Sequence, residues 1–202
     1  ISAGGTLLTS VLYITVAAHV GLLLPEHGMV ATWRFWVGDF VGVGVTMPFF
    51  WLLFSHPEKL KVALRNFHTV GYLLLSVAML GLAFGFSHDR QPNLFYLLFL
   101  PLIWAAAKQG VVGSAVAAFA LQTGIILGVH WFDIGTVEVF ELQVLGAALA
   151  FSGFFLGMVI DEKERIGGEL RQTLRLAAAG EMAAALTHEL NQPLTALSTY
   201  GT

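Results

Sequence analysis

The feature that most constrains this chain is a succession of long apolar stretches separated by short polar segments. A helix must present about 20 mostly apolar residues to cross a bilayer, because unpaired backbone groups find no partner in lipid. Six stretches approach or reach this length, at 7–24, 35–54, 67–86, 94–107, 111–130 and 142–160. The fourth is short and contains Pro101, so we expect it to be kinked or covered by neighbours. The predicted fold is all-α: a polytopic transmembrane helix bundle of about six spans.

Composition agrees with this prediction and divides the chain in two. Of the 202 residues 56% are hydrophobic and only 11% are charged, which is outside the usual range of soluble domains. Ten charged residues lie between Asp161 and Thr202, so we predict an integral membrane domain at 1–160 and a water-solvated region after it. The net charge of -3 and the absence of a basic stripe argue against a nucleic-acid partner. The absence of cysteine excludes disulfides and thiolate metal sites.

Basic residues in the short connections predict the orientation, because such residues are retained on the cytoplasmic side. The connections expected on that side carry Lys59, Lys61, Arg65, Lys108, Lys163 and Arg165. Those on the opposite side carry Arg34 and Arg90, and 131–141 carries none. With an even number of spans, both ends of the chain are expected in the cytoplasm. As a membrane protein, the chain is also expected to have lipid as a partner.

The region after residue 160 is rich in Ala, Leu, Glu and Arg, which are strong helix formers. We predict one long helix, loosened at most at Gly167 and Gly168. Apolar or small residues recur with the alternating spacing of three and four that is typical of a coiled coil, at Leu176, Ala179, Ala183, Leu186, Leu190, Pro193 and Leu197. The strict seven-residue seam comprises Leu176, Ala183, Leu190 and Leu197, and it predicts a homodimer.

His188 falls at the outward f position when Ala183 is placed at a. A single histidine on a helix is usually a solvated surface residue. Here, however, Glu189 follows it directly and Pro193 can bend the helix one turn later. A neutral imidazole is a competent nucleophile toward a phosphoryl group near neutral pH, and a neighbouring carboxylate can accept its ring proton.

The segment 180–200, GEMAAALTHELNQPLTALSTY, resembles the H box of sensor histidine kinases. The resemblance implies that His188 is phosphorylated, that Glu189 acts as base and that this helix begins a dimerisation and phosphotransfer bundle. ATP and Mg²⁺ would then bind in a catalytic domain outside these residues, and an aspartate of a response regulator would receive the phosphate. Many relatives have Thr or Asn at the position of Gln192, which is tied to phosphatase activity, so that activity is left open.

The membrane region resembles the membrane-associated sensor (MASE) type of domain, through WRFWVGDFVGVGVTMPFF at 33–50 and LPLIWAAAKQGVVGSAVA at 100–117. The two resemblances together imply a sensor histidine kinase of a two-component system in the bacterial inner membrane. We expect a sensor domain at 1–160 that is incomplete at its N-terminus, a signalling helix at 161–175 and a truncated phosphotransfer domain at 176–202. The alternatives are a small-solute transporter or channel with a helical tail, and a scaffold that only dimerises.

Polar residues inside or at the ends of spans are candidates for a sensing site, because burying them in lipid is costly. Asp39 and Arg34 can form an interfacial ion pair, or Gly38 and Asp39 can belong to a ligand or ion site. The other candidates are His19, Gln122 and His130, and His68 and Lys108 occupy similar positions. No two of these histidines are three or four residues apart, so no metal site is predicted.

Overall fold

A computed structural model describes the backbone of residues 2–21, 28–85, 92–131 and 136–200. Side chains are described within these ranges except at 2–3, 92–93, 136–139, 184–185 and 187–200. The described backbone is almost wholly helical and includes no strand, which confirms the predicted all-α class. The chain divides into two compact units, Ile1–Ile160 and Asp161–Thr202.

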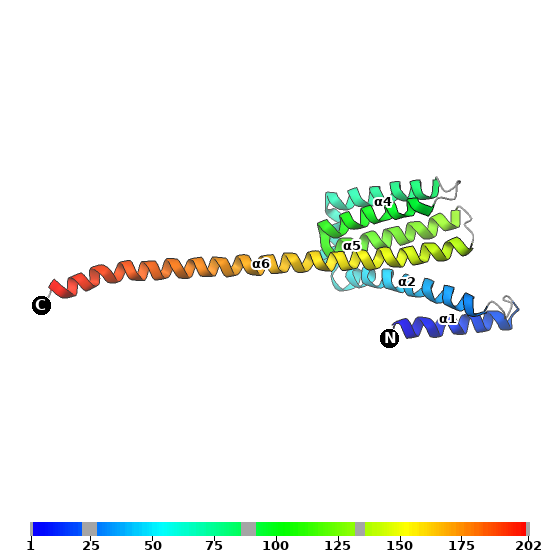
Figure 1. Cartoon of the computed structure of the whole chain (residues 1–202), viewed down its shortest axis with the longest axis horizontal. Coiled ribbons are helices and arrows are strands. Elements are labelled where there is room, and N and C mark those ends of the chain that lie inside the picture. The colour runs from blue at the N-terminus through cyan, green and yellow to red at the C-terminus, as the bar shows by residue number, and fades with distance from the viewer. Residues whose placement is uncertain (1, 22–27, 86–91, 132–135, 201–202) are drawn as a thin grey trace. The chain divides into compact units, whose positions relative to one another are not determined.

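The first unit is a helix bundle that runs back and forth along one axis (Figure 1). Its elements are α1 (Ser2–His19), α2 (Gly28–Ser55), α3 (Pro57–Arg65), α4 (Phe67–Gly85), the 3-10 helix η3 (Pro92–Leu98), α5 (Phe99–Trp131) and the first part of α6 (Thr136–Tyr200). α5 packs against α2, α3 and α4. α1 packs mainly on α2, where the rings of Tyr13 and Phe35 stack with centroids 4.6 Å apart.

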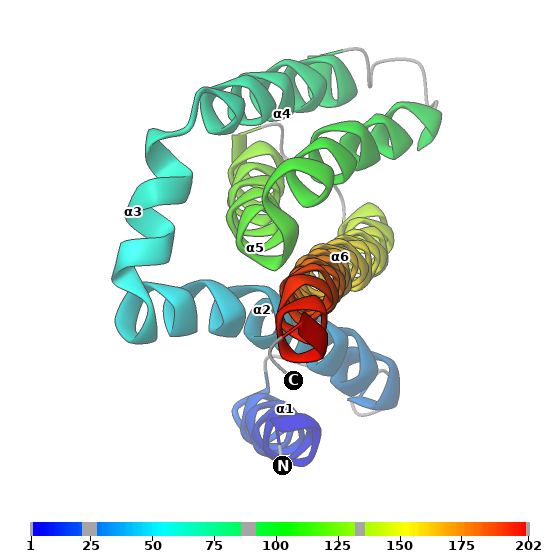
Figure 2. The same ribbon diagram turned by 90° about the vertical axis from the view of Figure 1, so that its left-hand side faces the viewer.

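Within the described residues, four helices are long and apolar enough to cross a membrane: Gly28–Ser55, Phe67–Gly85, Leu94–Trp131 and Phe140–Ala183. The predicted first span is represented by a shorter apolar helix, Gly4–His19. The predicted fourth and fifth stretches both lie in Leu94–Trp131, which is interrupted at Gly110 by a non-helical φ of 57° and ψ of -140°. Figures 1 and 2 show the ribbon reversing direction within α5, so its two arms run antiparallel. The bundle therefore fits the prediction, whereas the count of six spans stays a prediction.

The core of the first unit lies between α5 and its neighbours and combines small with large side chains. Ala105, Ala115 and Ala117 on α5 are fully buried, and they allow the helices to approach closely. Tyr72 of α4 and Leu102 of α5 fill the remaining space and are also fully buried. The core therefore centres on the two arms of α5.

The connection between the second and third predicted spans is a helix, α3, rather than the loop that the sequence suggested. Pro57 occupies its first turn, where a missing N–H costs nothing. Leu60 and Ala63 are buried on its inner face. α3 crosses from the end of α2 to the start of α4 (Figure 2).

The second unit is the C-terminal part of α6, and it is helical without interruption at Gly167 and Gly168. Arg165 donates hydrogen bonds to the Glu162 carboxylate at 2.6 and 2.9 Å and to that of Glu169 at 2.7 Å. Pairs at these spacings support an exposed helix only weakly, because water screens the charges. Few other side-chain interactions are described in this unit, so α6 here depends mainly on its helix-forming composition.

Candidate functional site

The predicted phosphoacceptor segment lies on the C-terminal part of α6. The backbone at His188, Glu189 and Gln192 is helical, and the side chains of these three residues lie outside the described part of the chain. Glu189 is adjacent to His188 in sequence, so the two residues occupy neighbouring positions on the same helical turn. Their roles stay predictions.

The predicted dimer seam starts on the same helix. Leu176 is 67% exposed, and Ala183 is exposed as well. Leu190 and Leu197 have helical backbones, but their side chains lie outside the described part of the chain. The described end of the seam therefore presents apolar area at the surface of its own helix.

Arg34 and Asp39 are half-buried on α2, but they do not form the ion pair that their proximity in sequence had suggested. A separation of five residues places them on different sides of a helix. The guanidinium of Arg34 instead lies 5.9 Å from the centroid of the Phe140 ring on α6, within range of a cation–π interaction. Arg34 therefore interacts with α6 rather than with Asp39.

Two glutamines bring polar groups to the packing surface of α6. A methyl group added to Gly146 of α6 would lie 2.7 Å from Oε1 of Gln122 on α5. A methyl group on Gly38 of α2 would lie 2.6 Å from Nε2 of Gln143 on α6. Gln122 thus lies against α6, and Asp39 follows Gly38, which packs against the same helix. His19 and His130 are exposed near helix ends.

Gln143 was not singled out from the sequence, although its spacing of three residues from Gly146 was a usable signal.

Among the described side chains there is no group of three or more His, Asp and Glu residues arranged to hold a metal ion.

A second polar cluster lies where α5 reverses direction. Gln109 donates a hydrogen bond from Nε2 to Oγ1 of Thr69 at 2.7 Å and accepts one at Oε1 from the hydroxyl of Tyr72 at 3.3 Å. Thr69 in turn donates to the carbonyl of Ala63 at the end of α3. Since Thr69 and Tyr72 are buried, this cluster joins α3, α4 and α5 through satisfied polar groups.

Ser114 connects the same reversal to α6. Its Oγ is fully buried and lies 2.9 Å from the carbonyl oxygen of Gly110 and 2.8 Å from that of Gly153 on α6. A methyl group on Gly157 would lie 2.6 Å from Ser114 Oγ and 2.9 Å from the Gly110 carbonyl. α6 therefore crosses the reversal at close range, and only glycine fits at residue 157. Gln109 and Ser114 belong to the quoted 100–117 segment, but the sequence had not indicated their roles.

Comparison with known proteins identifies the membrane region more firmly than the tail. The profile of the MASE1 family matches residues 2–164. The Sensor protein FixL of Bradyrhizobium diazoefficiens is 46% identical over 69 residues, which are 32% of this chain. The chain spans 14% of the length of that relative. No solved structure matches the chain.

Proposed function

The chain belongs to the MASE1 family, and from that premise we propose that it is the sensing and phosphoacceptor part of a membrane histidine kinase. A membrane sensor domain accounts for residues 2–164. The observation that carries the proposal further is the string His-Glu-Leu-Asn-Gln-Pro-Leu at 188–194, on the same helix that leaves this domain. Similarity to a protein named as a sensor supports the same assignment.

The proposed chemistry is transfer of a phosphoryl group from ATP to His188. An unprotonated ring nitrogen attacks the γ-phosphorus, the bond to the bridging oxygen breaks and ADP leaves. The other ring nitrogen then gives its proton to Glu189, which leaves a phosphohistidine with an uncharged ring and a negatively charged phosphoryl group. ATP and Mg²⁺ would be held by a catalytic domain outside these residues, and a receiver-domain aspartate of a response regulator would then take the phosphate.

The proposed route of the signal is α6 itself. Gly153 and Gly157 of α6 pack closely against Ser114 and Gly110, so a change in this contact has to shift or rotate α6. The same helix carries His188. A stimulus at the bundle would therefore change how two copies of α6 pair, and thereby how the histidine meets its catalytic domain.

Incorporation of labelled phosphate tests the proposal. The complete protein, including its catalytic domain, is incubated with ATP labelled on the γ-phosphate, and acid-labile phosphate is measured on the wild type, on His188→Ala and on Gln172→Ala. Gln172 is exposed on the same helix and serves as the matched control. We expect label on the wild type and on the control and only background on His188→Ala. Acid-labile phosphate persisting on His188→Ala would disprove the assignment.

The same assay separates this function from the alternatives. A small-solute transporter or a scaffold that only dimerises would take up no label on a histidine, and neither gives a reason for the string at 188–194.

Location in the bacterial inner membrane with both ends in the cytoplasm belongs to the same proposal. It rests on the distribution of basic residues.

A further inference from the structure

An open pocket of about 380 Å³ lies between α3 and α5, at the end of the bundle where α5 reverses direction. Its lining comes from α3, from Asn66 at the junction with α4, and from residues on both sides of the α5 reversal: Glu58, Lys59, Val62, Ala63, Asn66, Gln109 and Val112. We call it the α3–α5 pocket. Its volume falls within the range of about 300–1,000 Å³ that is usual for small-molecule sites.

The polar groups of the α3–α5 pocket favour an anion. Lys59 is exposed at the pocket, and the side-chain oxygen of Asn66 accepts a hydrogen bond from the backbone N–H of His68 at 3.2 Å. That bond leaves the amide nitrogen of Asn66 available as a donor. Glu58 is the one opposing charge in the lining, and its carboxylate lies 3.6 Å from Nδ1 of His56.

The charge around the pocket is also positive. Lys61 and Arg65 are exposed on α3, and Lys108 is exposed next to Gln109. Among the described residues of α3, three basic side chains therefore stand against the single carboxylate of Glu58. An anion that enters the pocket is therefore attracted by the positive charge of α3 as a whole as well as by Lys59.

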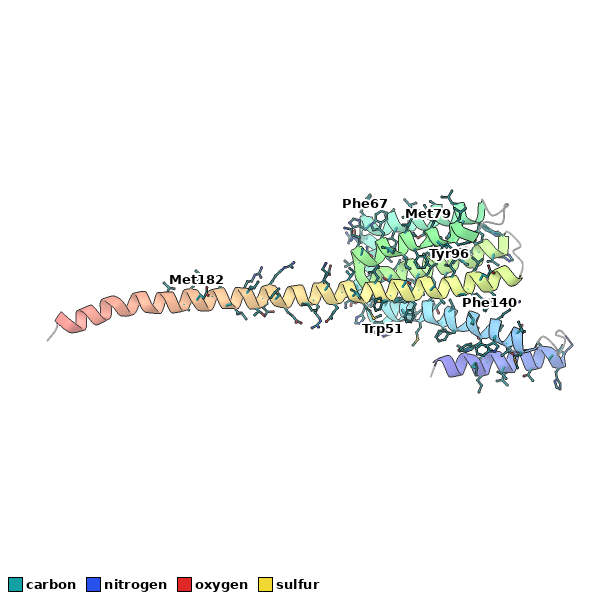
Figure 3. The ribbon with its side chains drawn as sticks, viewed as in Figure 1. Trp51, Phe67, Met79, Tyr96, Phe140 and Met182 are labelled. Atoms are coloured by element: carbon teal, nitrogen blue, oxygen red, sulfur yellow. The ribbon has the colours of Figure 1, made fainter. Side chains whose placement is uncertain are left out.

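Apolar side chains make up the other part of the lining. Val62 and Val112 line the pocket, and Val62 is 73% exposed. Phe67, which follows Asn66, is 83% exposed, and Figure 3 shows it at the same end of the bundle as Trp51. Exposed aromatic rings at the end of a membrane bundle are typical of the lipid headgroup level. The occupant must therefore combine a negative charge with apolar carbon.

We propose that the α3–α5 pocket binds the headgroup of an anionic glycerophospholipid. Lys59 pairs with the phosphate and the Asn66 amide donates to one of its oxygens. Val62 and Val112 contact the glycerol and the first acyl carbons. Basic pockets between membrane helices are a known way of holding such headgroups. This binding does not depend on phosphate transfer to His188.

The test uses the full chain in detergent, titrated with phosphatidylglycerol or with zwitterionic phosphatidylcholine, and native mass spectrometry counts the bound lipid. We expect preferential binding of phosphatidylglycerol, weakened about fivefold by Lys59→Gln, the factor expected for one basic side chain near an anionic surface. Val112→Trp fills the pocket and should reduce binding without lowering the unfolding temperature. Lys163→Gln, which removes the same charge from α6, is the matched control and should weaken binding much less than Lys59→Gln, because Lys163 does not line the pocket.

Three outcomes would overturn the proposal. Equal binding of the two lipids would remove the charge requirement. An equal loss in Lys59→Gln and Lys163→Gln would mean general attraction to a basic surface rather than a pocket. Displacement of phosphatidylglycerol by inorganic phosphate at comparable concentration would assign the site to a free anion. Resistance to inorganic phosphate, together with the loss in Lys59→Gln, supports the lipid.

Discussion

Gly110 determines the path of the chain through the membrane unit more directly than any other described residue. Its φ of 57° with ψ of -140° lies in a region that side chains other than glycine rarely adopt. The arm of α5 before Gly110 runs in one direction, and the arm after Gly110 runs back alongside it. The two arms then form the core against which α2, α3 and α4 pack.

We predict that Gly110→Ala destabilises the chain by about 1–3 kcal/mol, the usual cost of holding such a backbone conformation with a side chain present. The measurement is thermal or denaturant unfolding in detergent. Gly42→Ala is the control, because a methyl group there meets nothing within 4 Å and the residue is helical. That variant should be neutral or slightly stabilised. Equal unfolding of Gly110→Ala and the wild type would contradict the described reversal.

A residue of the site could be predicted from the sequence only where that residue was unusual by itself, without reference to its partners. Gln122 was recognised because a polar side chain inside an apolar stretch is unusual, and the structure places it against α6. Gln109 was read as part of a polar connection beside Lys108. Its partners Thr69 and Tyr72 lie about forty residues earlier in the chain, so their hydrogen bonds depend on tertiary packing that no local pattern reports.

At the scale of elements, the length rule for membrane helices located the apolar helices well, because the requirement for internal hydrogen bonding in lipid is strict. The same rule did not predict the structure of the segments that connect the spans. The segment of α3 was predicted to be a short basic loop between two spans, although Leu60, Ala63 and Leu64 already show helical spacing. The helix was missed because its basic residues were used only to assign the side of the membrane.

The exposed start of the second unit carries a prediction about pH. The hydrogen bond from Arg165, aided by its charge, lowers the pKa of Glu162 below its ordinary value. A depressed pKa means that the stabilisation is present above the ordinary value and is lost as the pH falls through the lowered one. We therefore expect the stabilising effect of this pair on α6 to be lost only at acidic pH, below the ordinary range of a glutamate.

Nuclear magnetic resonance titration of the Glu162 carboxyl carbon in the full chain measures this effect. Arg165→Gln should raise the pKa of Glu162 toward its ordinary value. Lys163→Gln removes the same charge from a residue that is not hydrogen-bonded to Glu162, and it should change the titration much less. Identical curves for the two variants would show that general charge, rather than the hydrogen bond, lowers the pKa.

At the scale of the whole molecule, the basic connections predict how the chain lies in the membrane. Reporters fused after Lys61 and after Lys108 should both read as cytoplasmic, and one near Gly135 should read as periplasmic. α3 and the reversal of α5 meet through the hydrogen bond from Gln109 to the carbonyl of Ala63 at 3.4 Å, so the first two positions are held at the same end of the bundle. Opposite readings after Lys61 and Lys108 would contradict this arrangement.

Pairing of two chains is the second prediction at this scale, and it follows from exposed apolar area on α6. Leu176, Met182 and Leu186 are 67%, 68% and 59% exposed on their own helix. Apolar area contributes about 25 cal/mol per square ångström when it is buried, so a partner helix on this side is favoured. The seam of Leu176, Ala183, Leu190 and Leu197 has the seven-residue period of a two-stranded coiled coil. Two copies leaving the same membrane face must run in the same direction, so the pair is parallel.

Single cysteines introduced into this cysteine-free chain test the pairing. A disulfide needs Cα atoms about 4.4–6.8 Å apart, and only seam positions of a parallel pair come that close. Leu176→Cys and Ala183→Cys should therefore cross-link between subunits, whereas His188→Cys at the outward position should not. The measurement is the fraction of covalent dimer on non-reducing gels after mild oxidation in membranes. If position 188 cross-links as readily as 176 and 183, the seven-residue frame is wrong. His188 would then lie inside the seam, where a catalytic domain cannot reach its ring.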